Sequence, residues 1–110
     1  EPWLSRPNMS DEQRLQMVVG EVQNARQQVA SLSAQIKEIS QTITAILQHP
    51  TDAALHRQMG AVLIEVTDRD ELVKDLENTN QRMSEALITI KEREAELVSA
   101  YETLKQNLGE

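Results

Sequence analysis

Cysteine and phenylalanine are both absent from this chain of 110 residues, which has only one tryptophan and one tyrosine. Without cysteine there is neither a disulfide framework nor thiol chemistry. A globular domain of this length normally closes its core with several aromatic side chains, each burying roughly 150–250 Å². An aromatic content of 2% therefore argues against a compact globular enzyme.

Glycine, proline and long apolar runs are also scarce. The chain has three glycines and three prolines, and no apolar run approaches the ~20 residues that cross a bilayer. No basic segment followed by a continuous apolar stretch marks a secretory signal. The rest is rich in Ala, Gln, Glu, Leu, Ile and Val, which is typical of long helices that pack along narrow seams. We therefore expect a cytoplasmic protein.

Basic residues are outnumbered by acidic ones, 11 against 18, for a net charge of −7. The excess lies late in the chain, because residues 68–110 contain eleven acidic and six basic residues, whereas residues 10–48 contain four and three. An acidic surface repels nucleic-acid phosphates and anionic lipid headgroups. We therefore expect no nucleic-acid partner and no membrane partner.

The first residues differ from everything that follows. Two prolines and the single tryptophan precede Met9, and the sequence from Met9 resembles a natural start. We interpret residues 1–9 as a disordered leader or a cloning remnant, with the alternative that Trp3 anchors a partner. Residues 10–110 are then predicted to form a single domain.

Residues 10–48 are predicted to form one long helix, because apolar residues recur at alternating steps of three and four, as in a coiled-coil seam. The seam contains Leu15, Val18, Val22, Ala25, Val29, Leu32, Ile36, Ile39, Ile43 and Ile46. Ser10 and Gln13 fit a capping box at the start. Pro50 predicts that this helix ends just before it, because the residue that precedes a proline disfavours helical geometry.

Residues 68–108 are predicted to form a second long helix, whose start is capped either by Asp68 with Glu71 or by Thr67 with Asp70. Its seam contains Val73, Leu76, Asn80, Met83, Leu87, Ile90, Glu94, Leu97, Tyr101, Leu104 and Leu108. Asn80 and Glu94 interrupt the apolar pattern. A lone polar residue in a seam often fixes the register of the helices.

Residues 49–67 connect the two helices. The segment after Gly60 is dense in aliphatic and β-branched residues, which favours a strand over residues 62–66. Gly60 suits a tight turn with a positive φ. Residues 53–59 fit either a short helix or a partner strand, and the need of residues 62–66 for a pairing partner favours a β-hairpin.

The connector is short and the helices are similar in length, so they should fold back as an antiparallel pair. An isolated two-stranded hairpin is marginally stable and would expose unpaired backbone groups. We therefore predict a mainly α fold, an antiparallel two-helix coiled coil with a central β-hairpin that assembles with other hairpins into an oligomeric β-barrel body. The residues predicted for this assembly are Leu55, Met59, Gly60, Val62, Leu63, Ile64 and Val66.

The order of these elements resembles a β-class prefoldin subunit over roughly residues 10–108. The sharpest match is the run from Met59 to Thr67, Met-Gly-Ala-Val-Leu-Ile-Glu-Val-Thr, followed by Glu71-Leu72-Val73 and Asp75-Leu76-Glu77-Asn78. Family members have an apolar-Gly-x-x-Leu-Val strand turn at this place, followed by a Leu-Glu-rich helix start. Arg57 and Gln58 depart from the family pattern, in which the strand before the glycine is more apolar.

The resemblance implies an ATP-independent molecular chaperone without cofactors. Prefoldins are hexamers of two α-type and four β-type subunits, so the implied partners are α-type and other β-type subunits. The distal coiled-coil tips capture unfolded polypeptides and deliver them to a group II chaperonin. In this chain the tips would contain Leu15, Met17, Val18, Val19, Leu97, Tyr101, Leu104 and Leu108. Met17 and Val19 flank the seam, so they widen its apolar stripe.

No arrangement of residues in the sequence points to catalysis or metal binding. His49 and His56 are the only histidines, and no cysteine is present to complete a zinc site. There is neither a glycine-rich phosphate loop nor a nucleophile motif. We therefore expect no enzyme, no catalytic residue, no metal and no cofactor. The alternative to a chaperone is a structural coiled-coil scaffold or spacer.

Overall fold

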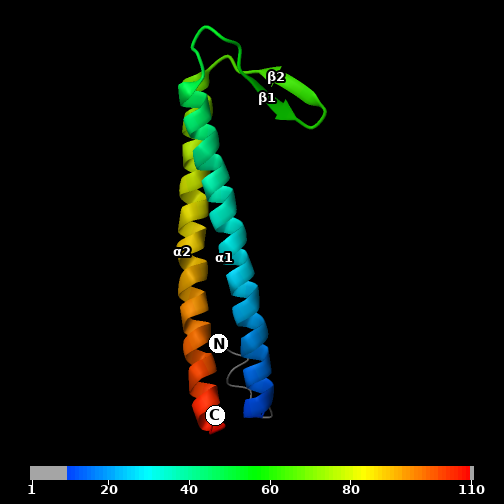
Figure 1. Ribbon diagram of the computed structural model, residues 1–110, viewed down its shortest axis with the longest axis vertical. Coiled ribbons are helices and arrows are strands. Elements are labelled where there is room, and N and C mark those ends of the chain that lie inside the picture. The colour runs from blue at the N-terminus through cyan, green and yellow to red at the C-terminus, as the bar shows by residue number, and fades with distance from the viewer. Residues whose placement is uncertain (1–9, 110) are drawn as a thin grey trace. The chain divides into compact units, whose positions relative to one another are not determined.

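The computed structural model describes residues 10–109, which form two long helices joined by a β-hairpin (Figure 1). The elements follow the order α1 (Asp11–Gln48), β1 (His56–Met59), β2 (Val62–Glu65) and α2 (Arg69–Asn107). The fold is mainly α, with one antiparallel two-stranded sheet. This arrangement confirms the predicted mainly α fold with two long helices and a central β-hairpin, whereas the assembly into a β-barrel body stays a prediction. The segment interpreted as a leader, residues 1–9, lies outside the described residues.

Helix α1 begins with the predicted capping box. The backbone N–H of Gln13 donates to Ser10 Oγ at 3.2 Å, and the backbone N–H of Ser10 donates to Gln13 Oε1 at 3.1 Å. These two bonds satisfy donors that the first turn of a helix leaves unpaired. The helix ends at Gln48, directly before the His49-Pro50 pair.

Helix α2 begins one residue later than the sequence suggested and ends one residue earlier. The backbone N–H of Glu71 donates to Asp68 Oδ1 at 3.0 Å, so Asp68 is the N-cap rather than Thr67. The helix runs from Arg69 to Asn107 and is followed by Gly109, whose φ of 75° is the left-handed geometry common after helix ends.

The connector forms the hairpin rather than the alternative short helix. The strands pair antiparallel, with Met59 opposite Val62 across a two-residue turn. Gly60 in this turn has a φ of 61°, which glycine adopts without steric cost. Strand β2 ends at Glu65, one residue before the predicted end, although Val66 still donates to Leu55 O at 2.7 Å.

The predicted seams are the sides of the helices that are shielded from solvent. Every seam position on both helices is buried or half-buried. The buried members in the described chain are Val18, Val22, Ala25, Ile46, Val73, Leu97 and Leu104, of which Val18 and Leu97 are the most enclosed. The core is therefore drawn out along the two helices, as expected for a chain that has few aromatic side chains.

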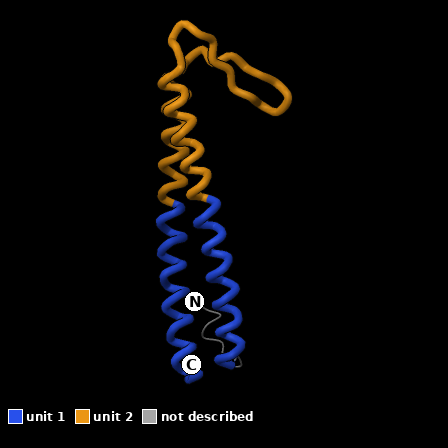
Figure 2. The backbone as a smooth tube through the Cα atoms, in the orientation of Figure 1, with its two compact units in different colours: residues 1–31, 86–110 blue, residues 32–85 orange. Residues whose placement is uncertain are grey.

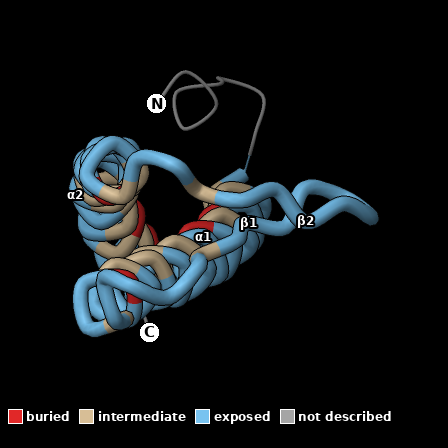
Figure 3. The backbone as a smooth tube through the Cα atoms, turned by 90° about the horizontal axis from the view of Figure 1, so that it is seen from above, coloured by how far each residue is buried: buried red, intermediate tan, exposed pale blue. Residues whose placement is uncertain are grey.

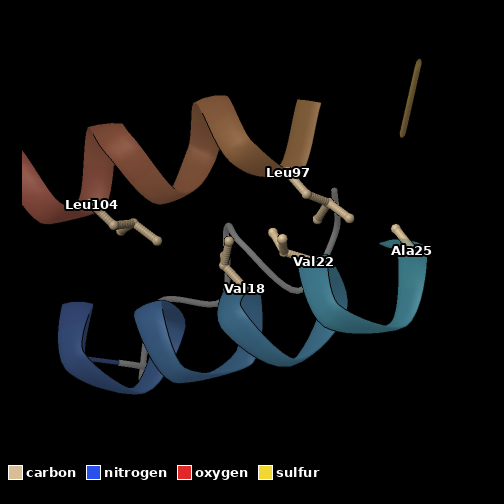
Figure 4. Close-up of a cluster of buried hydrophobic side chains, with 5 residues drawn as sticks. All are labelled: Val18, Val22, Ala25, Leu97 and Leu104. Atoms are coloured by element: carbon tan, nitrogen blue, oxygen red, sulfur yellow. The ribbon is translucent and has the colours of Figure 1, made fainter. Parts of the chain in front are cut away.

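The chain divides into two compact units, coloured separately in Figure 2. Unit 1 is described over residues 10–31 and 86–109, and unit 2 over residues 32–85. In unit 1, the α1 side chains Val18, Val22 and Ala25 point toward Leu97 and Leu104 of α2 (Figure 4). Unit 2 contains the buried side chains Ile46 and Val73 and the whole hairpin.

Candidate functional site

The predicted capture residues of α1 differ in exposure. Val18 is 0% exposed, whereas Met17 and Val19 on either side of it are 37% and 38% exposed. Leu15 is half-buried and packs against the core of unit 1. Neighbouring residues in a helix are 100° apart, so the side chain that faces α2 is enclosed while those on both flanks meet solvent. Only Met17 and Val19 of this group offer free apolar surface.

The predicted capture residues of α2 are mostly packed inward. Leu97 is 2% exposed and Leu104 is 8% exposed, and both belong to the core cluster of unit 1. Tyr101 and Leu108 are half-buried. Leu97 and Leu104 therefore hold the two helical segments together, and they are not free surface for a ligand in this structure.

A groove of about 330 Å³ lies beside this core within unit 1. It is lined by Val19, Val22, Gln23, Arg26, Val98, Tyr101 and Glu102. The α1 members are spaced by three, one and three residues, and the α2 members by three and one, so each set lies on one side of its helix. The groove thus has a floor of valine and tyrosine and a polar edge.

Ion pairs also join the helical segments of unit 1. Arg26 Nε lies 3.1 Å from Glu94 Oε1, and Arg93 Nη2 lies 3.7 Å from Glu21 Oε2. These pairs are partly exposed, so each contributes at most about 1 kcal/mol to stability. The Lys105 ammonium lies 5.6 Å from the centre of the Tyr101 ring, within range of a cation–π contact.

The residues predicted for assembly all lie at the hairpin in unit 2. Both strands are exposed along their whole length (Figure 3). The apolar side chains are open to solvent, with exposed fractions of 54% for Met59, 59% for Val62, 67% for Leu63 and 45% for Ile64. Leu55 and Val66, at the base of the hairpin, are half-buried.

The register sorts these strand residues onto two faces. Directly paired residues share one face of a sheet, and successive residues alternate between faces. The pairs Met59 with Val62 and Arg57 with Ile64 therefore occupy one face, which we call the apolar face. The pairs Gln58 with Leu63 and His56 with Glu65 occupy the opposite, polar face.

Arg69 organises the connector, a role that the sequence analysis missed. Its Nη1 donates to His49 O at 2.7 Å, and its Nη2 donates to Pro50 O at 2.8 Å and Ala53 O at 3.1 Å. The ring nitrogen Nε2 of His49 lies 3.2 Å from Ala54 O. The forked guanidinium thus gathers carbonyl oxygens that follow the end of α1. Only a sharp fold of the connector brings these carbonyls together, so no sequence motif marks them.

The groove residues Val22, Gln23, Arg26, Val98 and Glu102 were also missed. Val98 had a detectable signal, because it follows the seam residue Leu97 and is an off-seam apolar residue, as Val19 is beside Val18. The polar residues Gln23, Arg26 and Glu102 had no detectable signal in the sequence, since polar and charged residues cover the outer sides of most long helices.

The described residues contain neither a helix suited to a bilayer nor a cluster suited to a metal ion. Over residues 10–109, no helix combines the length and hydrophobicity that a bilayer crossing requires. Within the same range, no group of three or more His, Cys, Asp or Glu side chains could hold a metal ion.

The fold is similar to two solved structures from Thermococcus strain KS-1. The prefoldin beta subunit has a TM-score of 0.76 and 19% sequence identity, over 86% of this chain and 82% of that one. The prefoldin beta2 subunit has a TM-score of 0.70 and 22% identity, over 82% of this chain and 95% of that one. No curated protein sequence matches the chain.

The sequence itself matches the profile of a known family over nearly its whole length. The profile is described as "Prefoldin subunit", and the match covers residues 11–110. It includes both helices, the hairpin and all the residues of the groove. The chain therefore belongs to the prefoldin subunit family, whose members are non-enzymatic chaperone cofactors that assemble with other prefoldin subunits.

Proposed function

We propose that this chain is a cytosolic, ATP-independent chaperone subunit that captures unfolded polypeptides on unit 1. The observation that carries the proposal is the groove of about 330 Å³, which the exposed Val19 lines, together with the exposed Met17 on the opposite flank of α1. Unfolded chains expose apolar side chains without a fixed shape. An open apolar surface can bind them without a specific sequence, and methionine suits this because its side chain adapts its shape.

The same observation favours capture over a purely structural coiled coil. A spacer needs only the seam positions that join its two helices. Met17 and Val19 lie outside the seam, where they add little to the contact between helices. Exposed apolar side chains next to a groove are a feature of binding surfaces. The polar edge of Gln23, Arg26 and Glu102 supplies hydrogen-bonding groups for the backbone of a bound segment.

We further propose that the hairpin joins α-type and other β-type subunits into a hexamer, which hands captured chains to a group II chaperonin. The exposed Met59, Val62, Leu63 and Ile64 support an assembly role, because a two-stranded hairpin is marginal by itself. Capture and assembly would then use different residues of the chain, so each can be tested by separate substitutions.

Capture is tested by the double variant Met17→Ser, Val19→Ser. We expect the wild-type protein, assembled with an α-type subunit, to suppress the aggregation of a chemically denatured client without ATP. The double variant should need several-fold more protein for the same protection, because it loses apolar surface and keeps the core of Val18 and Leu97. Light scattering during dilution of the denatured client measures this.

The matched control is Ile88→Ser, since Ile88 is an apolar residue of unit 1 that is 58% exposed and does not line the groove. This variant should protect the client as the wild type does. Equal protection by the double variant, with unchanged helicity and assembly, would contradict capture at Met17 and Val19 and favour the spacer.

Assembly is tested by Ile64→Asp, which places a carboxylate on the apolar face. Analytical ultracentrifugation of this variant mixed with an α-type subunit should show loss of the hexamer while circular dichroism remains helical. Gln58→Asp on the polar face is the control and should still assemble. An intact hexamer with Ile64→Asp would contradict the role of the apolar face.

A further inference from the structure

The groove of unit 1 offers both apolar surface and a carboxylate. Glu102 lines it, and among residues 10–109 no hydrogen bond or ion pair engages the Glu102 carboxylate. The neighbouring basic groups are engaged elsewhere, Arg26 by Glu94 at 3.1 Å and Lys105 by the Tyr101 ring at 5.6 Å. An occupant that combines a large apolar side chain with a basic group therefore fits this groove.

Residues 1–9, which we call the N-terminal segment, precede α1 and lie outside the described residues. The segment contains the only tryptophan of the chain, Trp3, which is followed by Leu4, and a single basic residue, Arg6. The proposed function uses none of these side chains. Within four positions the segment thus supplies both kinds of group that fit the groove.

The N-terminal segment is long enough to reach the groove. Along α1, Val19 and Val22 lie about 14 and 18 Å from Ser10, at 1.5 Å per residue. Trp3 stands seven residues before Ser10, and an extended chain of that length spans up to about 23 Å. Trp3 can therefore return along α1 to the apolar part of the groove.

The opposite charges can meet at the same time. Arg26 lies about 24 Å along α1 from Ser10, and it is paired with Glu94. Within unit 1, α2 runs back toward the start of α1 (Figure 4), so Glu102 lies about 12 Å closer to the level of Ser10 than Glu94 does. Arg6 stands four residues before Ser10 and spans about 13 Å, which matches that level.

A tethered segment needs little intrinsic affinity to occupy a site. A short flexible linker gives the attached group an effective concentration in the millimolar range. A contact with a dissociation constant of about 1 mM would therefore fill the groove about half of the time. Tyr101 favours tryptophan as the occupant, because a pair of aromatic rings gains energy beyond the area that it buries.

We propose that the N-terminal segment occupies the groove of its own chain, with Trp3 against Tyr101 and the Arg6 guanidinium on the Glu102 carboxylate. The groove of about 330 Å³ lies at the small end of ligand pockets, so Trp3 and a client segment exclude each other. The segment is thus a built-in competitor that a client must displace. This inference rests on the proposed capture of clients on unit 1, and it adds a regulation of that site.

The fluorescence of the full chain tests the occupancy, because Trp3 is its only tryptophan. We expect an emission maximum at a shorter wavelength than that of free N-acetyltryptophanamide, and weaker quenching by acrylamide. Val98→Ser removes apolar surface from the groove and should shift the emission toward that of the free amide. Ile88→Ser, exposed on the same helix and outside the groove, is the control and should leave the emission unchanged.

A wild-type spectrum equal to that of the free amide would overturn the proposal. An emission that Val98→Ser leaves unchanged, or that Ile88→Ser shifts equally, would overturn it as well. Circular dichroism of each variant shows whether its helices remain intact.

A reversal of the charges tests the contact of Arg6 with Glu102. Glu102→Lys places two basic groups together and should release Trp3, with a shift to longer wavelength. Adding Arg6→Glu to this variant restores an opposite pair and should return the emission to the wild-type position. A double variant that stays at the longer wavelength would contradict the placement of Arg6.

Competition is measured with a fluorescein-labelled peptide of leucine, alanine and serine as the client, by fluorescence anisotropy. The apparent dissociation constant equals the intrinsic one divided by the fraction of groove that is free, so Trp3→Ser should bind the peptide at least about twofold more tightly than the wild type. The unlabelled peptide should shift the wild-type Trp3 emission to longer wavelength. Equal affinity of the two proteins would overturn the role of competitor.

The proposed function and this inference fail separately. If Met17→Ser, Val19→Ser protects a client as well as the wild type, capture is wrong, and the Trp3 emission still decides whether the segment occupies the groove. If that variant loses protection but Trp3 has the spectrum of the free amide, capture stands and only the occupation by the N-terminal segment is wrong.

Discussion

Arg26 and Glu94 are 68 residues apart in the sequence, and their side chains meet at 3.1 Å between α1 and α2 in unit 1. Glu94 is one of the two residues that interrupt the apolar seam of α2. The other, Asn80, donates from Nδ2 to Ser40 Oγ of α1 at 2.9 Å in unit 2. Each interruption thus makes a polar contact with the opposite helix, which supports the interpretation that these residues align the helices.

Asn80→Leu should stabilise the chain. Asn80 Oδ1 is buried without a hydrogen-bond partner, and its replacement removes that cost and adds apolar contact in the seam. We expect the free energy of unfolding to rise by about 1 kcal/mol, measured by urea denaturation. Asn78→Leu, on the exposed side of α2, is the control and should change it by less than about 0.5 kcal/mol. A loss of stability in Asn80→Leu would show that the bond to Ser40 outweighs the unpaired oxygen.

Leu97→Ala should destabilise the chain by about 2–5 kcal/mol, because it leaves a cavity among Val18, Val22 and Ala25. Thermal unfolding followed by circular dichroism measures the effect. Ile88→Ala lies on the same helix at an exposed position and should cost less than about 1 kcal/mol. Similar losses in the two variants would contradict the assignment of Leu97 to the core.

Arg69→Lys should loosen the connector while keeping the charge. Lysine cannot present the fork that reaches the carbonyls of His49, Pro50 and Ala53 together. Amide hydrogen exchange over residues 49–55 should accelerate about tenfold or more, since hydrogen bonds to charged groups contribute about 1.5–3 kcal/mol. Arg82→Lys is the control, because the hydrogen bond that Arg82 makes within residues 10–109 goes to Thr79 Oγ1 in its own helix, at 3.4 Å. Unchanged exchange in Arg69→Lys would mean that the connector is held by other contacts.

Gly60→Ala should destabilise the hairpin by about 1–2 kcal/mol, because an L-residue pays that cost at a φ of 61°. Steric crowding is not the cause, since a Cβ at this position meets nothing within 4 Å. Gly20→Ala, inside α1 with equally open surroundings, should instead stabilise the chain by about 1 kcal/mol. Amide exchange of the strands and thermal unfolding distinguish the two effects. A neutral Gly60→Ala would show that the turn relaxes to another geometry.

Much of the fold could be predicted because it depends on local patterns. The step of three and four along α1 and α2 is a property of helical geometry, so it identified the enclosed side of each helix before any contact was known. The Ser10–Gln13 capping box and the turn at Gly60 are equally local. The sequence could not decide whether Asp68 or Thr67 is the N-cap of α2, because both residue types suit that position.

The candidate site was predicted only in part. Off-seam apolar residues pointed to Met17 and Val19, and both are exposed. The same reasoning could not tell that Leu97 and Leu104 are enclosed, since a seam residue near a helix end can pack or remain open. The groove beside them depends on the lateral alignment of two segments more than sixty residues apart, which no local pattern contains.

By itself, the sequence determined the two helices, the hairpin between them and the line of apolar residues that joins the helices, because each follows from the repeat of neighbouring residues. Only the tertiary structure decided which polar residues meet across the helices, how Arg69 gathers the connector, and which face of the hairpin carries Arg57. These depend on register and on the path of the chain, which are set by packing between segments that are distant in sequence.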